Sequence, residues 1–433
     1  MKRRAPFLAL LSSYTISVAG TSMSALAIPW LVLTSTGSAA KTGLVGFATM
    51  APYVAAMALI GPLVDRAGLR RSFVLGNAVA AVVVGAIPLA QALGALHLPV
   101  LLALVAVAGV ARGAADCANS ALVPTTAETA GTPLERAAGL TSGANRTALL
   151  LGAPLAGALV VVAGAPVVVA IDAATFAVAA VIGAIWVRVA VPPSRHAACR
   201  SGAGQRLPVA GAGSALRRYR RDLAAGLTFL RGDRLLLGII TMSAVTNLLD
   251  QGLSEVMLPV WVRERIGSAG ALGLIAGIGG LGSVLGNLVG AWLGPRLSRR
   301  KLFTVGFLAG GSPRFFVLVL TSALSPVLAL YLVSDAFGGS LNSVIGATSY
   351  ERIPEDLRAR VLGTIRASAW IGIPFGALFA GYAVAWLGLR ATLLGFGAAY
   401  LLTTLAPLVF PAWRQLRRPE PVPVEPRQPA PAV

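Results

Sequence analysis

The stretch RTALLLGAP, residues 146–154, returns 220 positions later as RASAWIGIP, residues 366–374. Arginine, glycine and proline occupy the same relative places in both copies. A second pair supports the repeat, because GPLVDRAGLRR, residues 61–71, is echoed by GAWLGPRLSRR, residues 290–300, at an offset of 229. Repeats of this length, each covering several apolar segments, are typical of chains built from two related helix bundles around a central path.

The composition is that of a membrane protein. Of the 433 residues, 56% are hydrophobic and 12% are charged, and the mean hydropathy is +0.78. Apolar runs of about 20 residues, enough to cross about 30 Å of hydrocarbon, can be placed twelve times. They begin near residues 7, 42, 72, 99, 137, 165, 236, 270, 302, 326, 360 and 390. Since strand-like alternation is absent, we expect an all-α polytopic membrane protein with twelve transmembrane helices.

The strong positive charge has a topological explanation. A net charge of +20 would suggest a nucleic-acid partner for a soluble chain, but we expect none here. In the predicted topology, 28 of the 36 Lys and Arg residues fall on one side of the membrane. This asymmetry predicts a multi-pass protein of the plasma membrane with both termini and the central loop in the cytoplasm.

The chain divides into four predicted parts. Residues 1–187 form an N-terminal six-helix bundle, residues 188–235 a cytoplasmic linker, residues 236–411 a C-terminal six-helix bundle, and residues 412–433 a disordered cytoplasmic tail. Within the linker, basic and apolar residues at 214–230 alternate at helical spacing. We expect this amphipathic helix to lie along the anionic inner leaflet of the lipid bilayer. A solvated connecting helix is the alternative.

The loop between the second and third predicted spans carries a recognisable pattern: Gly61, Leu63, Asp65, Arg66, Gly68 and Arg70. It resembles the cytoplasmic loop signature of the major facilitator superfamily, although Leu69 replaces a usual basic residue and Gly294 replaces the aspartate in the second copy. The resemblance implies the major facilitator fold, with twelve helices in two six-helix pseudo-symmetric halves. Residues 118–124, 171–176, 221–231 and 353–363 resemble the enterobactin and macrolide efflux-type exporters of that superfamily.

We predict that this loop is a conformational latch, formed by Gly61, Asp65, Arg66, Gly68, Arg70 and Arg71. Gly61 would let two helices approach closely. The Asp65 carboxylate at a helix end can accept from backbone donors and from the neighbouring arginines. If it loses that partner in the other conformation, an Asp65→Asn variant should fold but lose transport.

Charged residues inside spans are candidates for function, because each costs about 3 kcal/mol at the bilayer centre unless it is paired or faces water. Arg112 and Asp116 lie four residues apart on one helix face. We predict that Asp116 binds and releases a coupling proton while Arg112 favours its ionised form. A permanent ion pair is the alternative. Asp250 and Glu255 in the seventh span are the other predicted proton-coupling carboxylates.

A polar stripe crosses the seventh span at Asn247, Asp250 or Gln251, and Ser254. A polar stripe on a membrane-spanning helix must face a water-filled space. We therefore predict a substrate cavity formed by Asn247, Gln251 and Ser254 with Tyr14, Ser17 and Thr21 of the first span. The alternative is an interhelical hydrogen-bond seam. Arg314 and Asp335 are predicted to form a structural ion pair.

The repeated stretches 146–154 and 366–374 also suggest contacts between the halves. Arg146 and Arg366 occupy equivalent positions, and Pro154 and Pro374 follow each at the same distance. We predict inter-half contacts that exist in one conformation only, with each proline bending its helix. Ordinary packing of small residues is the alternative.

Enzyme functions are disfavoured. There is no Gly-x-x-x-x-Gly-Lys-Ser/Thr phosphate loop, and the histidines and the two cysteines offer no metal site, cofactor site or disulfide. We expect a monomeric secondary transporter, a proton-coupled exporter (antiporter) of small amphipathic molecules such as drugs, antibiotics or siderophores, working by alternating access. An importer of a sugar or metabolite and a non-transporting membrane sensor are the alternatives.

Overall fold

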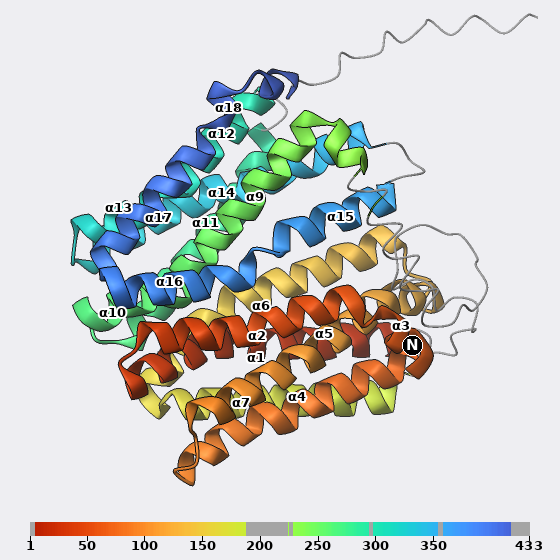
Figure 1. The fold of residues 1–433 in the computed structure, drawn as a ribbon. Coiled ribbons are helices and arrows are strands. Elements are labelled where there is room, and N and C mark those ends of the chain that lie inside the picture. The colour runs from red at the N-terminus through yellow and green to blue at the C-terminus, as the bar shows by residue number, and fades with distance from the viewer. Residues whose placement is uncertain (1–4, 188–223, 225–227, 294–297, 354–357, 417–433) are drawn as a thin grey trace, which may run out of the picture.

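The computed structural model describes residues 5–187, 224, 228–293, 298–353 and 358–416, and these residues are almost entirely helical (Figure 1). Twelve helical stretches are long and apolar enough to cross a membrane. The prediction of twelve spans is confirmed, and most observed starts fall within about three residues of the predicted ones. The predicted amphipathic helix lies outside the described residues except for Ala224 and residues 228–230. Of the tail predicted to be disordered at 412–433, residues 417–433 lie outside the described residues. Residues 412–416 are ordered, because they lie in or directly after a short 3-10 helix whose Trp413 is buried.

The first six spans are formed by seven helices, since a short helix stands between the second and third spans. They are α1 (Ala5–Thr36), α2 (Ala39–Leu59), α3 (Gly61–Ala67), α4 (Leu69–Ala92), α5 (Leu98–Thr129), α6 (Leu134–Ala163) and α7 (Ala165–Trp186).

The second six spans are more broken. Their elements are α9 (Arg234–Gly252), a π-helical turn η2 (Leu253–Met257), α10 (Leu258–Arg265), α11 (Ala269–Leu293), α12 (Arg299–Gly310), α13 (Ser312–Leu320), α14 (Leu324–Arg352), α15 (Arg358–Trp370), α16 (Ile373–Leu387), α17 (Leu389–Thr404), α18 (Ala406–Val409) and η3 (Pro411–Gln415). Spans seven, nine, eleven and twelve each contain more than one element.

Equivalent turns in the two sets of spans have the same backbone geometry. Gly164 ends α6 and begins α7 with φ of 85°, and Gly388 ends α16 and begins α17 with φ of 79°. These are the turns between spans five and six and between spans eleven and twelve. Side-chain-bearing residues rarely adopt such φ values, so glycine permits each tight reversal.

In each set of spans, the arginine at the second position of the third span bonds to the end of the sixth span. Arg70 near the start of α4 donates to backbone carbonyls of Gly183 and Ala184 in α7. In the second set of spans, Arg300 near the start of α12 donates to the Pro407 carbonyl in α18 at 2.8 Å. Each bond joins a third span to a sixth, and carbonyls at a helix C-terminus favour a cationic donor.

The two sets of spans meet near one membrane face. We call the end of the bundle at which α1 begins the N-terminal face and the opposite end the far face. Towards the far face, a Cβ added to Gly157 of α6 would lie 2.8 Å from Cα of Gly273 in α11. A Cβ added to Gly43 of α2 would lie 3.0 Å from Cα of Gly381 in α16. These small residues bring the backbones of the two halves together.

Towards the N-terminal face, the same helices are not covered. Ala138, Gly139, Leu140, Ser142 and Gly143 of α6 are all exposed. These residues cover more than half of the helix circumference, and Ala137 on the remaining side packs against α1 and the end of α5 of the same half. The halves are therefore in contact at the far face, and the exposed side of α6 leaves the structure open towards the N-terminal face.

Candidate functional site

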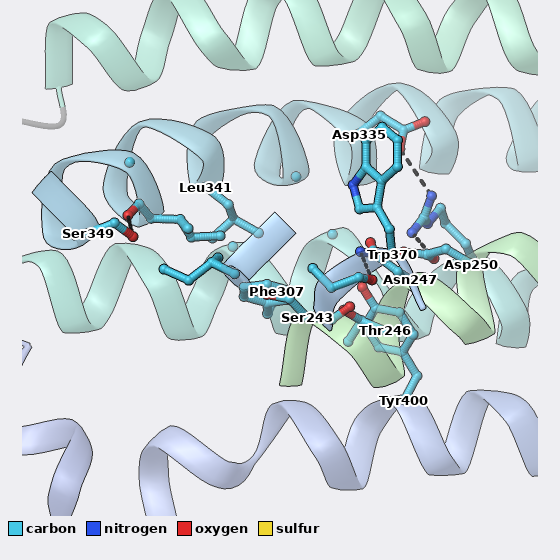
Figure 2. A pocket seen from close by; sticks show the side chains of 18 residues that line it. Ser243, Thr246, Asn247, Asp250, Phe307, Asp335, Leu341, Ser349, Trp370 and Tyr400 are labelled. Carbon is cyan, nitrogen blue, oxygen red and sulfur yellow. Dashed lines mark hydrogen bonds and ion pairs between the residues drawn. The ribbon is translucent and has the colours of Figure 1, made fainter. Parts of the chain in front are cut away.

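A cavity of about 570 Å³ lies within the second six spans. Part of its wall is one face of α14, formed by Asp335, Gly338, Leu341, Ile345 and Ser349. These residues span about 21 Å at 1.5 Å per residue. Figure 2 shows Asp335 at one end of the cavity and Ser349 at the other. Since α14 ends at the N-terminal face, the cavity runs from the middle of the bundle towards the open side.

Three charged residues meet at the inner end of this cavity. Arg314 of α13 donates to Asp250 of α9 at 2.6 Å and to Asp335 of α14 at 3.2 Å (Figure 2). The predicted pair of Arg314 and Asp335 is therefore present, and Asp250 joins it as a third member. Side-chain exposures of 16% for Arg314 and 34% for Asp250 leave the carboxylate in contact with the cavity. With both acids ionised, this triad has a net charge of −1.

The rest of the lining combines rings and polar groups. Phe307, Trp370 and Tyr400 contribute aromatic surface, and Asn247 donates to the Ala369 carbonyl at 3.1 Å (Figure 2). A cavity that combines aromatic surface with many polar groups and one uncompensated carboxylate can hold an amphipathic molecule that has a polar or cationic end.

A second polar cluster lies in the first six spans. The Tyr53 hydroxyl of α2 donates to Asp116 of α5 at 3.0 Å. The Arg112 guanidinium, one turn before Asp116, stacks over the Tyr53 ring at 5.3 Å from its centroid. Arg112 and Asp116 thus share one helix face, as their spacing indicates, and Tyr53 connects them.

Glu255 lies at the boundary between the halves. It sits in the π-helical turn η2 and accepts a hydrogen bond from Gln251 at 3.2 Å. It also lines a small cavity of about 80 Å³ whose other walls come from the first six spans and include Thr21, Arg112 and Asp172. Sequence reasoning did not place Asp172 in the site, although a lone carboxylate in the apolar run of the sixth span was a signal for it.

The predicted substrate-cavity residues do not share one cavity. Asn247 lines the large cavity and Thr21 the small one. Ser17 donates to Asn77 at 3.3 Å, which matches the alternative of an interhelical seam. Ser254 bonds to the Asp250 carbonyl in its own span at 3.0 Å. Tyr14 lies within electrostatic range of Asp116 and Arg112.

The predicted latch lies at the N-terminal face in α3 and the start of α4. The expectation that Gly61 brings two helices together is wrong for this conformation, because a Cβ there would meet no atom within 4 Å. Gly68 is needed instead for its backbone, with φ of 90° at the junction of α3 and α4. Asp65 occupies the last turn of α3, and Arg66 and Arg71 are exposed.

The residues predicted to form inter-half contacts lie in different environments. Pro154 packs against α11, since a Cβ on Gly277 would lie 2.4 Å from the proline ring. Arg146 is exposed on the uncovered part of α6. Pro374 lies in the first turn of α16, directly after the break that separates it from α15. The Arg366 side chain lies outside what the structure describes.

Twelve spans in two related sets, a cavity between membrane-crossing helices, and closure between the sets at one face only are the features of a membrane transporter and not of an enzyme. The sequence profile described as Major Facilitator Superfamily matches residues 10–254 and 240–433. The chain belongs to this superfamily.

Curated relatives and solved structures agree with this assignment. The chain is 28% identical over 425 residues to the multidrug efflux pump Tap of Mycobacterium tuberculosis, with 95% of each chain covered. It is 26% identical over 427 residues to the Tap pump of Mycolicibacterium fortuitum, covering 96% of this chain and 98% of the relative. The nucleoside transporter NupG shares the fold with a TM-score of 0.68 at 12% identity, over 93% of this chain and 98% of NupG.

Proposed function

We propose that the protein exports small amphipathic molecules, such as drugs, across the plasma membrane by alternating access. The cavity of about 570 Å³ carries this proposal, because it combines aromatic walls with the partly exposed Asp250 carboxylate and runs towards the open N-terminal face. The similarity to pumps named for multidrug efflux, over 95% of both chains, supports cargo of this class.

The direction follows if the N-terminal face is cytoplasmic. The positive-inside rule supports this orientation, since 28 of the 36 Lys and Arg residues fall on that side. In the conformation described here the cavity would then take cargo from the cytoplasm. Rocking of bundles 1–187 and 236–411 would close the N-terminal face and open the far face for release.

We propose protons as the coupling ion, moving inwards as cargo moves out. In this scheme Asp116 balances the charge of Arg112 through their shared neighbour Tyr53. An Asp116→Asn variant leaves Arg112 without that balance, so we expect the variant to fold and to lose gradient-driven export.

Reconstitution tests this function. Proteoliposomes loaded with a fluorescent cationic dye should lose it faster when a pH gradient is imposed, and Asp116→Asn should remove the acceleration. Efflux that ignores the gradient in the unmodified protein would rule out proton coupling. Absence of dye movement under any gradient, together with movement of a sugar or metabolite, would rule out the exporter.

A further inference from the structure

Two carboxylates from opposite halves share the small cavity of about 80 Å³. Asp172 projects from α7 of the first half and Glu255 from η2 of the second. Asp172 is 2% exposed, and its one side-chain hydrogen bond of ordinary geometry among the described residues comes from Thr175 at a long 3.4 Å. Glu255 accepts from the neutral Gln251. No cation lies within ion-pair distance of either acid in the described part of the chain.

The cavity wall holds a further polar group beside Asp172. The Ser24 hydroxyl lies near the Asp172 carboxylate and is 5% exposed, but its oxygen makes no hydrogen bond of ordinary geometry to the described residues. Space for the Asp172 carboxylate is made by Gly20 of α1, where a Cβ would lie 2.6 Å from Asp172 Oδ1. Ser24 and Thr175 are thus the polar side chains beside Asp172, and neither carries a charge.

The helix carrying Glu255 is irregular at that residue. The π-helical turn Leu253–Met257 interrupts the seventh span between α9 and α10. One extra residue in a turn rotates the following side chains by about 100°. Asp250, before the turn, faces the large cavity of the second half, whereas Glu255, within it, faces the first half. Such turns are frequent at functional sites.

The charged and titratable groups around the pair are few. Arg112 of α5 lines the same cavity, but it stacks on Tyr53, whose hydroxyl donates to Asp116. Tyr14 of α1 adds a neutral phenol near that group. The remaining wall residues from α1, α2, α4 and α5 are apolar or carry hydroxyls. Arg112 lies within electrostatic range of both Asp116 and Asp172, so one cation faces three acids and cannot compensate the pair of Asp172 and Glu255 in full.

We propose that Asp172 and Glu255 form the coupling-proton site, and that binding of a proton there favours closure of the far face. Closure brings Glu255 into the cavity of the first half and removes water from both acids, which is costly while both are ionised. The proton arrives from water at the far face and leaves towards the N-terminal face. Arg112 in the wall disfavours a metal cation. The role of the pair in coupling rests on the proposed proton-coupled export. The experiment below does not depend on it, because it measures a distance and not transport.

The test measures the far face and not transport. Spin labels at Lys41→Cys in α2 and Leu387→Cys in α16 report the separation of the halves there by pulsed electron paramagnetic resonance, in a background with Cys117 and Cys199 replaced. We expect the mean distance to lengthen as the pH rises. In an Asp172→Asn/Glu255→Gln double variant, which mimics the protonated pair, the distance should stay short at every pH. Labels at Lys41→Cys and Leu93→Cys, both in the first half, are the matched control and should not respond.

Three outcomes overturn the proposal: a far-face distance that does not change with pH, a double variant that keeps the pH response, or a response to Na⁺ at fixed pH that depends on the same two residues. A dye-export assay tests the proposed transport function separately from the proton site. In the double variant the ratio of efflux rates with and without a pH gradient should fall to about 1. If the unmodified protein exports nothing, the distance measurement still decides whether the two acids sense protons.

Discussion

At the scale of single residues, Asp233 shows how one carboxylate joins three helices at the N-terminal face. Its Oδ1 accepts from the backbone N–H of Leu235 at 3.0 Å and of Leu236 at 3.1 Å, so it caps α9. Its Oδ2 accepts from Arg352 at the end of α14 at 2.7 Å, and Arg352 also donates to Gln415 of η3. Burial acts to raise the pKa of Asp233, but the bonds from Arg352, Leu236 and Leu235 outweigh it and hold the pKa below its ordinary value.

Substitutions of Asp233 should distinguish the stability that comes from the helix cap from the stability that comes from the ion pair. We expect Asp233→Ala to lower the stability by about 1–2 kcal/mol, and Asp233→Asn by less, because asparagine also caps helices. A depressed pKa in the folded state means that the contribution of the charge is present above about pH 4 and is lost as the pH falls through the lower folded-state value. Thermal unfolding in detergent should therefore show a gap between the unmodified protein and the Asp233→Asn variant at pH 7 that shrinks in acid; a gap independent of pH would contradict this.

The latch glycines give a second prediction. Gly68 has φ of 90° and ψ of 135°, a conformation open to almost no other residue, whereas nothing surrounds Gly61 within 4 Å of an added Cβ. Gly68→Ala should cost about 1–3 kcal/mol of stability. Gly61→Ala, the matched control, should leave the unfolding temperature in this conformation unchanged. Equal effects of the two substitutions would show that the junction of α3 and α4 is not held by this backbone geometry.

Residue pairing was predictable within one helix and, for Arg314 and Asp335, between two helices joined by a short loop. The spacing of Arg112 and Asp116 placed them on one face, and Tyr53 now connects them. Helical periodicity does not say which partner a face meets, so it could not reveal that Asp250 joins Arg314 or that Glu255 faces Asp172. These neighbours come from helices far apart in the sequence.

At the scale of elements, hydropathy located the twelve spans but not their breaks. Length and apolarity decide whether a helix crosses the bilayer, and both can be read from the sequence. The π-helical turn at Leu253–Met257 and the division of α15 from α16 depend on packing. The proline in each repeat shows that the sequence does not fix where a helix breaks. Helix α6 continues through Pro154, whereas a helix break precedes Pro374.

The glycine contact between α6 and α11 should set how often the far face closes. A Cβ on Gly157 would lie 2.8 Å from Gly273 Cα and 2.9 Å from the Ala269 carbonyl. Overpacking costs about 1–3 kcal/mol, and about 1.4 kcal/mol changes a population tenfold. Gly157→Ala should thus lengthen the far-face distance between labels at positions 41 and 387.

The control for this substitution lies on the same helix. Gly139 has no atom within 4 Å of an added Cβ, so Gly139→Ala should leave the distance distribution as it is. A Gly157→Ala distribution identical to that of the unmodified protein would mean that this contact does not oppose separation of the halves.

At the scale of the whole molecule, the repeat in the sequence corresponds to a repeat in the structure. Gly164 and Gly388 make the same turn, and Arg70 and Arg300 bond to the ends of equivalent spans. Twelve spans in two sets were predictable because they follow from composition and repetition. The closure at the far face was not, since it belongs to one conformation and the same sequence must also allow another.

Linking the two halves where α2 meets α16 tests alternating access most directly. The rings of Phe47 in α2 and Phe375 in α16 lie 5.5 Å apart across the halves, while Phe375 and Phe379 lie 6.0 Å apart within α16. In a chain without native cysteines, a short bismaleimide should link Phe47→Cys to Phe375→Cys and stop dye export in proteoliposomes. The same reagent on Phe375→Cys and Phe379→Cys should leave export intact. Full export by protein that is completely cross-linked between positions 47 and 375 would contradict the rocking of two halves.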